Sequence, residues 1–404
     1  MSSRTFRRVL VAFDKFKGAL GAEAACDAAR RALVRRHPGV FVDVAPLTDG
    51  GDGFCPILTR AANGELHERV ATGPLFEGGK APGLTVSIGC VAIERLPVRA
   101  RERLELDASA RRLAVIDMAS VNGLALVPRA DIDVWRSSSY GTGELLLAAQ
   151  ALGADAILLG VGGSATSDLG LGALAALGYR FLSEAGEVVS PPLPADWSRI
   201  RRIEGKLTPG LPPLRIACDV DNPVFGPRGA SAVYGPQKGL TPEDRPRLDL
   251  EGERLARLLC QHVGAGSEAL TRPGSGAAGG IAFGLAVAAG ARLVPGWALV
   301  EAWLGIDARL HQCDCLITGE GRFDESSWAG KGPGSVLAAA RALGRRAVVF
   351  AGSVSEGARA GVLGDGTCEL IAISEPTEPL DRALSRTEEN LERHVEAWLA
   401  TADA

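Results

Sequence analysis

The residues best suited to chemistry form a glycine-rich segment near the middle of the chain, at residues 160–168. An apolar run precedes the segment and an alanine- and leucine-rich run follows it, which predicts a strand, a tight turn and a helix. Glycine lets backbone N–H groups approach a ligand, and the first amides of a helix favour negative charge. We therefore expect phosphate to bind here through backbone amides and hydroxyl groups. The candidate residues are Gly162, Gly163, Ser164, Ala165 and Thr166.

Other interpretations of this segment remain open. Asp168 either caps the following helix or holds a metal ion. The spacing of Gly160, Gly162 and Ala165 also fits a loose dinucleotide-binding fingerprint, with Glu184 where a ribose-binding acid would lie. A tight turn without any ligand is the plainest alternative.

Carboxylates follow two further predicted strands. Asp49 lies among glycines after the strand at 40–45, and Asp219 and Asp221 follow the strand at 214–217, with Asn222 beside them. Ligands of open parallel sheets bind at the carboxyl ends of strands. Hard oxygen ligands of this kind suit Mg²⁺, or one carboxylate acts as a base. The alternatives are a solvated turn at Asp49 and an Asx-type turn before Pro223.

Cations and two further carboxylates complete the set of candidates. Lysine is rare among the 44 basic residues, yet most lysines lie in glycine-rich segments, where a compact ammonium suits phosphate. A second glycine-rich segment, 273–280, either binds a ligand or packs closely against another helix. The residues added here are Asp14, Lys15, Lys17, Lys238, Gly276, Glu320 and Arg322.

Length and composition indicate an ordinary globular protein of two or three domains. The 404 residues are 46% apolar and 23% charged, and the net charge is −4, which gives no reason to expect nucleic acid or an anionic membrane as a partner. The uncharged stretch 275–291 is rich in glycine and alanine and predicts a buried helix rather than a membrane span. The cysteines form no C-x-x-C pair, and the N-terminus lacks the apolar run of a signal peptide. We expect reduced cysteines and a cytoplasmic location.

Eight segments, taken together, resemble the type I glycerate kinase family. They span most of the chain and follow the family's order. They are DKFKG at 14–18, TDGGDG at 48–53, YGTGEL at 140–145, GVGGSATSD at 160–168, ACDVDNP at 217–223, GPQKG at 235–239, GSGAAGG at 274–280 and ITGEGR at 317–322.

The resemblance implies phosphorylation of D-glycerate to 2-phosphoglycerate, with ATP and Mg²⁺ as cofactors. It also implies an α/β fold with two α/β domains and the active site in the cleft. One is a flavodoxin- or Rossmann-like parallel-sheet domain built from both chain ends (1–74 and 304–404), and the other is inserted in it (75–303). The chain departs from the family pattern at Lys15, at Asp117, at 167–169 and at 133–136.

Roles can be assigned to the candidates on this basis. Phosphoryl transfer needs in-line positioning, cations on the phosphates and a carboxylate near the attacking hydroxyl. The catalytic candidates are Asp219, Lys17 and Lys238; the nucleotide-binding candidates are Gly162, Gly163, Ser164, Ala165, Thr166 and Gly276; the substrate-binding candidates are Asp14, Lys15, Asp49, Asn222, Glu320 and Arg322; the metal candidates are Asp221 and Asp168. Asp219 and Asp221 can exchange the roles of base and Mg²⁺ ligand.

Three alternatives to this function remain open. The first is a kinase of the same chemistry acting on another small hydroxy acid or a polyol. The second is an NAD-dependent oxidoreductase that uses the 160–165 fingerprint, and the third is a regulatory protein that binds ATP without catalysis. The sequence leaves open whether the chain is a monomer or a homodimer.

Overall fold

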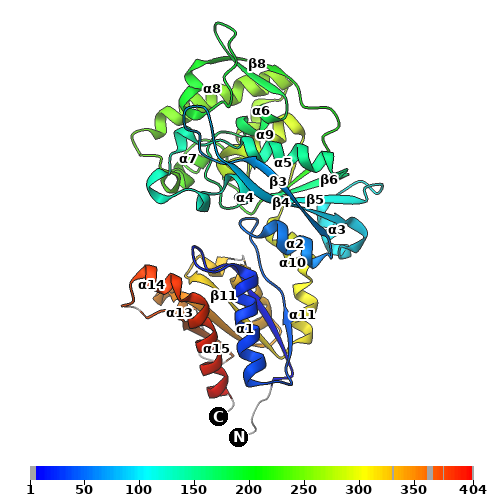
Figure 1. Cartoon of the computed structure of the whole chain (residues 1–404), viewed down its shortest axis with the longest axis vertical. Helices are drawn as coiled ribbons and strands as arrows, with labels where there is room; N and C mark the ends of the chain where they lie inside the picture. The colour runs from blue at the N-terminus through cyan, green and yellow to red at the C-terminus, as the bar shows by residue number, and fades with distance from the viewer. Residues whose placement is uncertain (1–5, 330–331, 362–366, 376, 403–404) are drawn as a thin grey trace. The chain divides into compact units, whose positions relative to one another are not determined.

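The computed structural model describes the chain except for residues 1–5, 330–331, 362–366, 376 and 403–404. The chain divides into two compact units, coloured along the sequence in Figure 1. Unit 1 comprises Met1–Asp49 and Val300–Ala404, and unit 2 comprises Gly50–Leu299. Across the described residues, none of the helices has the length and apolar character needed to cross a membrane.

Unit 1 is built on a five-stranded parallel sheet in the order β13-β12-β11-β1-β2. Its central strands are nearly continuous apolar runs, as expected of a parallel sheet covered on both faces. Numbered along this unit, the strand order is 2-1-3-4-5, and the direction of winding reverses between β1 and β11. The strands are β1 (Arg8–Phe13), β2 (Phe41–Val44), β11 (Cys315–Phe323), β12 (Arg346–Val354) and β13 (Cys368–Ala372).

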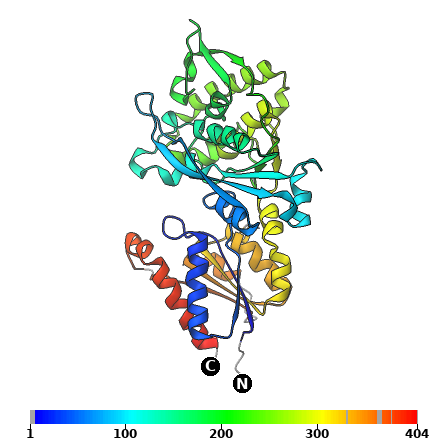
Figure 2. The ribbon, with the colours of Figure 1, turned by 45° about the vertical axis from the view of Figure 1, so that its right-hand side comes forward.

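Helices cover this sheet on both faces (Figures 1 and 2). α1 (Ala22–Arg36) and α15 (Thr387–Ala402) bury their apolar faces against Val9, Val11 and Phe13 of β1 and against their neighbours on β11 and β12. Arg31 of α1 also pairs with two glutamates of α15. α11 (Ile306–Gln312) and α12 (Gly332–Ala342) lie on the opposite face. The short helices α13 (Glu356–Ala360) and α14 (Leu380–Ser385) follow β12 and β13.

Unit 2 contains a six-stranded mixed sheet in the order β10-β9-β6-β5-β4-β3. β10, β9, β6 and β5 pair in parallel, whereas β4 pairs antiparallel with both β5 and the edge strand β3. Every residue of β6 is buried, which agrees with its uninterrupted apolar sequence. The strands are β3 (Glu65–Thr72), β4 (Gly83–Ala92), β5 (Arg112–Asp117), β6 (Ala156–Gly160), β9 (Leu214–Ala217) and β10 (Arg292–Val294).

The helices of unit 2 are α2 (Phe54–Ala61), α3 (Val98–Leu104), α4 (Ala119–Asn122), α5 (Tyr140–Ala151), α6 (Leu171–Ala176), α7 (Ala230–Tyr234), α8 (Arg245–Val263) and α9 (Ala277–Ala289); α10 (Gly296–Leu304) continues into unit 1. Of these, α4, α5, α6, α8 and α9 pack into one core with the six-stranded sheet. β7 (Tyr179–Ser183) and β8 (Ile200–Gly205) form a separate antiparallel pair. The α/β fold class predicted from the sequence is therefore confirmed.

Candidate active site

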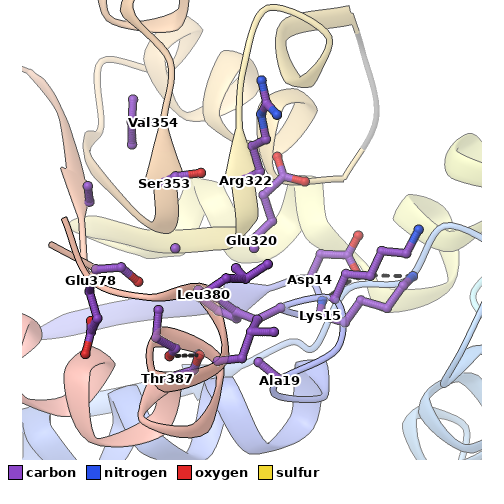
Figure 3. A pocket seen from close by; sticks show the side chains of 18 of the residues that line it. Asp14, Lys15, Ala19, Glu320, Arg322, Ser353, Val354, Glu378, Leu380 and Thr387 are labelled. Atoms are coloured by element: carbon purple, nitrogen blue, oxygen red, sulfur yellow. Dashed lines mark hydrogen bonds and ion pairs between the residues drawn. The ribbon is translucent and has the colours of Figure 1, made fainter. Parts of the chain in front are cut away.

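A pocket of about 770 Å³ opens at the carboxyl ends of the strands of unit 1. It lies where the winding of the sheet reverses, because Asp14 directly follows β1 and Glu320 lies near the end of β11 (Figure 3). Ligands of doubly wound sheets bind at this topological position. Six residues that the sequence singled out for substrate binding or catalysis line it: Asp14, Lys15, Lys17, Asp49, Glu320 and Arg322.

Lys15 holds two of the pocket's carboxylates. Its Nζ donates a hydrogen bond to Asp49 Oδ1 at 2.9 Å and lies 3.9 Å from Asp14 Oδ1. Its backbone N–H donates to the same Asp14 oxygen at 2.7 Å. The charges of this part of the pocket are thus partly compensated within the protein.

Glu320 has an altered pKa. Burial, reinforced by the negative charges of Asp14, Asp324 and Asp49, raises its pKa to about 7, against the opposing effect of a hydrogen bond with Ser327. This carboxyl group therefore changes its protonation state near neutral pH.

Two cations of the pocket reach toward solvent. Lys17 is exposed, and the Arg322 side chain is 72% exposed, with its Nε 3.2 Å from Asp324 Oδ2. Both have room to contact an anionic ligand.

In unit 2, the glycine-rich loop after β6 differs from the sequence expectation. Gly162 N–H donates to Gly50 O at 2.9 Å, and Ala165 N–H donates to Asn122 O at 2.9 Å. These two amides stabilise the fold, so they are not available to a phosphate. In the described part of the chain, the amides of Gly163 and Ser164 have no such acceptor.

A buried carboxylate caps the helix that follows this loop. α6 begins at Leu171, and the Asp168 carboxylate accepts hydrogen bonds from the backbone of Ser139, Gly170 and Gly172 and from the Ser139 hydroxyl. Asp168 is fully buried, and this burial raises its pKa. These contacts favour the capping role over the metal role.

Lys238 is the main charged group beside this loop. Its Nζ donates to Ser164 Oγ at 2.9 Å and to Thr166 O at 2.6 Å, and only 2% of the residue is exposed. Burial lowers its pKa to about 7, against the opposing charge of Asp168. An ammonium has three donors, so a third hydrogen bond can go to a ligand.

Nearby hydroxyl groups are buried without partners. Within the described residues, Thr166 Oγ1, Ser167 Oγ and Ser275 Oγ have no hydrogen-bond partner. Buried polar groups are rarely left unsatisfied in a native protein, so such groups are candidates for ligand contacts. Thr166 was predicted to bind the nucleotide; Ser275 was missed as a single residue, although its glycine-rich segment was identified.

The second glycine-rich segment packs directly against the first. A Cβ on Gly279 would lie 2.1 Å from Thr166 O, and one on Gly276 would lie 2.2 Å from Pro223 O. Gly276 N–H also donates to Asn222 O. Close packing of two backbones is therefore the demonstrated reason for these glycines.

The acidic loop after β9 has structural contacts of its own. Asp219 Oδ2 accepts from Trp297 N–H at 2.8 Å, near the start of α10, and Asp221 is exposed, 3.6 Å from Arg228. Asn222 donates to Arg228 O and accepts from the Tyr234 hydroxyl. The described residues contain no cluster of three or more His, Cys, Asp or Glu side chains suited to a metal.

The far wall of the unit 1 pocket contains none of the residues predicted from the sequence. This wall comes from the carboxyl ends of β12 and β13 and from α14 and α15 (Figure 3). Ligands of parallel sheets bind at the carboxyl ends of strands, and this rule, which identified Glu320, applies equally to Ser353 and Ser374. The wall residues on α14 and α15 have no such pattern in the sequence. The wall residues include Ser353, Ser374, Glu378, Leu380, Leu384 and Thr387.

The position of Glu184 does not support the dinucleotide-binding interpretation, in which this residue would bind the ribose. Glu184 directly follows β7, which pairs with β8 in a separate sheet rather than with β6. Its side chain is 90% exposed and lies 3.8 Å from Arg201. The acid of a dinucleotide-binding fingerprint belongs instead to the same βαβ unit as the glycine loop.

Comparisons with known proteins agree along nearly the whole chain. The glycerate kinase family profile matches residues 9–402. A glycerate kinase of Bacillus subtilis is 34% identical over 397 residues, covering 96% of this chain and 95% of the relative. A glycerate 2-kinase of Escherichia coli K12 is 31% identical over 357 residues, covering 86% of each.

A solved structure gives the same result. The crystal structure assigned to glycerate kinase 2 of Salmonella typhimurium LT2 superposes with a TM-score of 0.72 at 31% identity, covering 98% of each chain. Sequence and fold therefore both identify a kinase, which excludes the oxidoreductase alternative. This chain belongs to the glycerate kinase family.

Proposed function

We propose that this enzyme transfers the γ-phosphate of ATP to the 2-hydroxyl of D-glycerate and releases 2-phosphoglycerate. The family and the relatives' names support glycerate as acceptor, and the name of the E. coli relative supports the 2-position. The observation that carries the proposal is the pocket at the winding reversal of unit 1, which combines cations with carboxylates.

In this proposal the unit 1 pocket binds the acceptor. The exposed cations of Lys17 and Arg322 attract the carboxylate of the hydroxy acid, since an arginine fork matches carboxylate geometry. Asp14 and Asp49 accept hydrogen bonds from its hydroxyl groups, and Lys15 holds both in position. Recognition of a small polar molecule by a few placed polar groups is typical of such sites.

The glycine-rich loop of unit 2 is proposed to bind the phosphates of ATP. The unpartnered hydroxyls of Thr166 and Ser167, the amide of Gly163 and the third donor of Lys238 are suited to phosphate oxygens. A bound polyphosphate would favour the charged form of Lys238 and compensate for the cost of its burial.

Mg²⁺ is proposed to accompany ATP, where it would neutralise charge on the phosphates. Mg²⁺ is commonly held by one or two carboxylates together with substrate phosphates and water. The donor set of Asp219 and Asp221 fits this pattern without needing a three-residue cluster. Asp168 is the weaker candidate, because four protein donors already occupy its carboxylate.

An ADP-release assay with ATP, Mg²⁺ and a panel of acceptors tests the proposal. D-Glycerate should give the highest kcat/KM, and ³¹P NMR of the product should show the 2-phosphate. L-Glycerate serves as the stereochemical control. ATP binding without ADP release from any acceptor would contradict the proposal and support the regulatory alternative.

A different acceptor is the second candidate function, and the size of the pocket favours it. A volume of about 770 Å³ is more than a three-carbon acid requires, because pockets of this size accommodate drug-sized ligands. Longer hydroxy acids and polyols therefore belong in the acceptor panel. A higher kcat/KM on one of them would keep the kinase chemistry and replace D-glycerate.

A further inference from the structure

Glu320 is placed by the sheet beside the carboxylate that follows β1. The parallel register pairs Phe13 with Gly319, and Asp14 N–H donates to Gly319 O at 2.9 Å. Both side chains line the pocket at the winding reversal (Figure 3). A ligand at this edge of the sheet would therefore lie next to Glu320.

The other carboxylates near Glu320 are already matched with cations. Asp14 and Asp49 contact Lys15, and Asp324 contacts Arg322. In the described ranges, no lysine or arginine makes an ion pair with Glu320, although it is partly buried. Ion pairing makes a carboxylate a weaker proton acceptor, because it stabilises the charged form. Of these four carboxylates, Glu320 is the one that no lysine or arginine of the described residues holds in its charged form.

We propose that Glu320 is the proton acceptor of the reaction, taking the proton of the attacking acceptor hydroxyl onto its carboxylate. The inference rests on the proposed function. The O–H bond breaks and its electron pair forms the new O–P bond, while the bond between the γ-phosphorus and its bridging oxygen breaks and leaves its electrons on ADP. The proton moves to a Glu320 carboxylate oxygen, and Asp219 is left as an Mg²⁺ ligand.

The protonation behaviour of the side chain fits this role. The ideal general base has a pKa near the operating pH, and the pKa of Glu320 is about 7. The ionisable groups that surround it come from several elements: Asp14, Lys15 and Lys17 after β1, Asp49 after β2, Arg322 and Asp324 on its own side, and Arg359, Glu375 and Glu378 on the far wall.

The Glu320→Gln variant tests the proposal, since it retains the shape and removes the base. We expect kcat to fall about 10²-fold or more, while the KM for D-glycerate changes only a few-fold. The wild-type pH profile of kcat/KM should rise through an acidic limb near pH 7, and this limb should be absent from the variant. Infrared difference spectra of the protein without ligand should show a carboxyl group titrating near pH 7 in the wild type only.

Glu392→Gln is the matched control, because it makes the same change in a partly buried carboxylate of unit 1 that is not among the residues lining the pocket. It should keep both kcat and the acidic limb. Glu320→Gln with kcat within three-fold of wild type, or with the acidic limb retained, would overturn the proposal. Wild-type protein that acts only on another acceptor would contradict the glycerate assignment alone, and the same variants would then be measured on that acceptor. Wild-type inactivity with every acceptor would overturn both.

Discussion

The unit 1 pocket and the glycine-rich region of unit 2 handle charge in opposite ways. In unit 1, lysine, arginine and carboxylate side chains meet at strand ends in an open pocket and partly neutralise one another. In unit 2, a single buried lysine and several unpartnered hydroxyls lie among tightly packed backbones. An open pocket suits reversible binding of a small acid, whereas the buried lysine and unpartnered hydroxyls of unit 2 suit the proposed phosphate ligand.

The largest effect is expected from removing the buried charge of unit 2. Lys238→Met should weaken ATP binding about 10²-fold, because a hydrogen bond between charged groups contributes about 1.5–3 kcal/mol. The pKa of Lys238 is lowered in the folded protein, so the buried charge of this lysine destabilises the fold fully below about pH 7. The destabilisation disappears as the pH rises from about 7 toward 10.5. The variant should therefore be at least as stable as the wild type at pH 6. Calorimetric ATP titration and thermal unfolding measure both effects.

Two controls sharpen this test. Lys80→Met changes an exposed lysine and should alter neither quantity. A Lys238→Met protein that binds ATP normally would remove the unit 2 loop from the proposed phosphate site.

The next effect concerns the packing of the two glycine-rich segments. Gly279 has φ +68°, and an added Cβ would lie 2.1 Å from Thr166 O. Gly279→Ala should lower the free energy of unfolding by about 2–4 kcal/mol, from left-handed strain and overpacking together. Urea denaturation measures the change.

Gly264→Ala is the matched control for that variant. Gly264 also has a positive φ, of +73°, but nothing lies within 4 Å of its added Cβ. It should show the backbone strain without the clash. Equal destabilisation by both substitutions would contradict the packing argument.

A smaller effect is expected on the stability of unit 1. The raised pKa of Glu320 means that the folded protein binds the carboxyl proton more tightly than the unfolded chain does. The contribution of this proton to the free energy of unfolding is therefore complete below about pH 4.5, and it is lost as the pH rises through about 7. Glu320→Gln should match wild-type stability at pH 4 and exceed it by about 3 kcal/mol at pH 8. Urea denaturation at both pH values tests this, and a pH-independent difference would contradict the assigned pKa.

The smallest effect is expected from the partly exposed Lys15. Lys15→Ser removes its contact with Asp49, and ion pairs near the surface contribute about 0–1 kcal/mol. The KM for D-glycerate should rise less than ten-fold, with the dissociation constant for ATP unchanged. A large loss of ATP binding would contradict the proposal that the charged residues of the unit 1 pocket bind only the acceptor.

Much of the candidate site could be predicted from strand ends. Apolar runs that end in polar residues identified Asp14, Asp49 and Glu320, because the side chains at the carboxyl ends of parallel strands meet at one edge of the sheet. The far wall of the pocket could not be predicted in full. Leu384 and Thr387 have ordinary helical neighbours, and only the packing of α14 and α15 brings them to the pocket.

The sequence by itself determined the α/β class, the family and the residue types available at each loop, since these depend on local periodicity and on motifs. Only the tertiary structure decided how the groups are used. Gly162 and Ala165 donate their amides to Gly50 and Asn122, and Asp168 caps α6. The physical reason is that a hydrogen-bonding group takes whichever partner the fold brings within reach, and segments distant in sequence supply these partners.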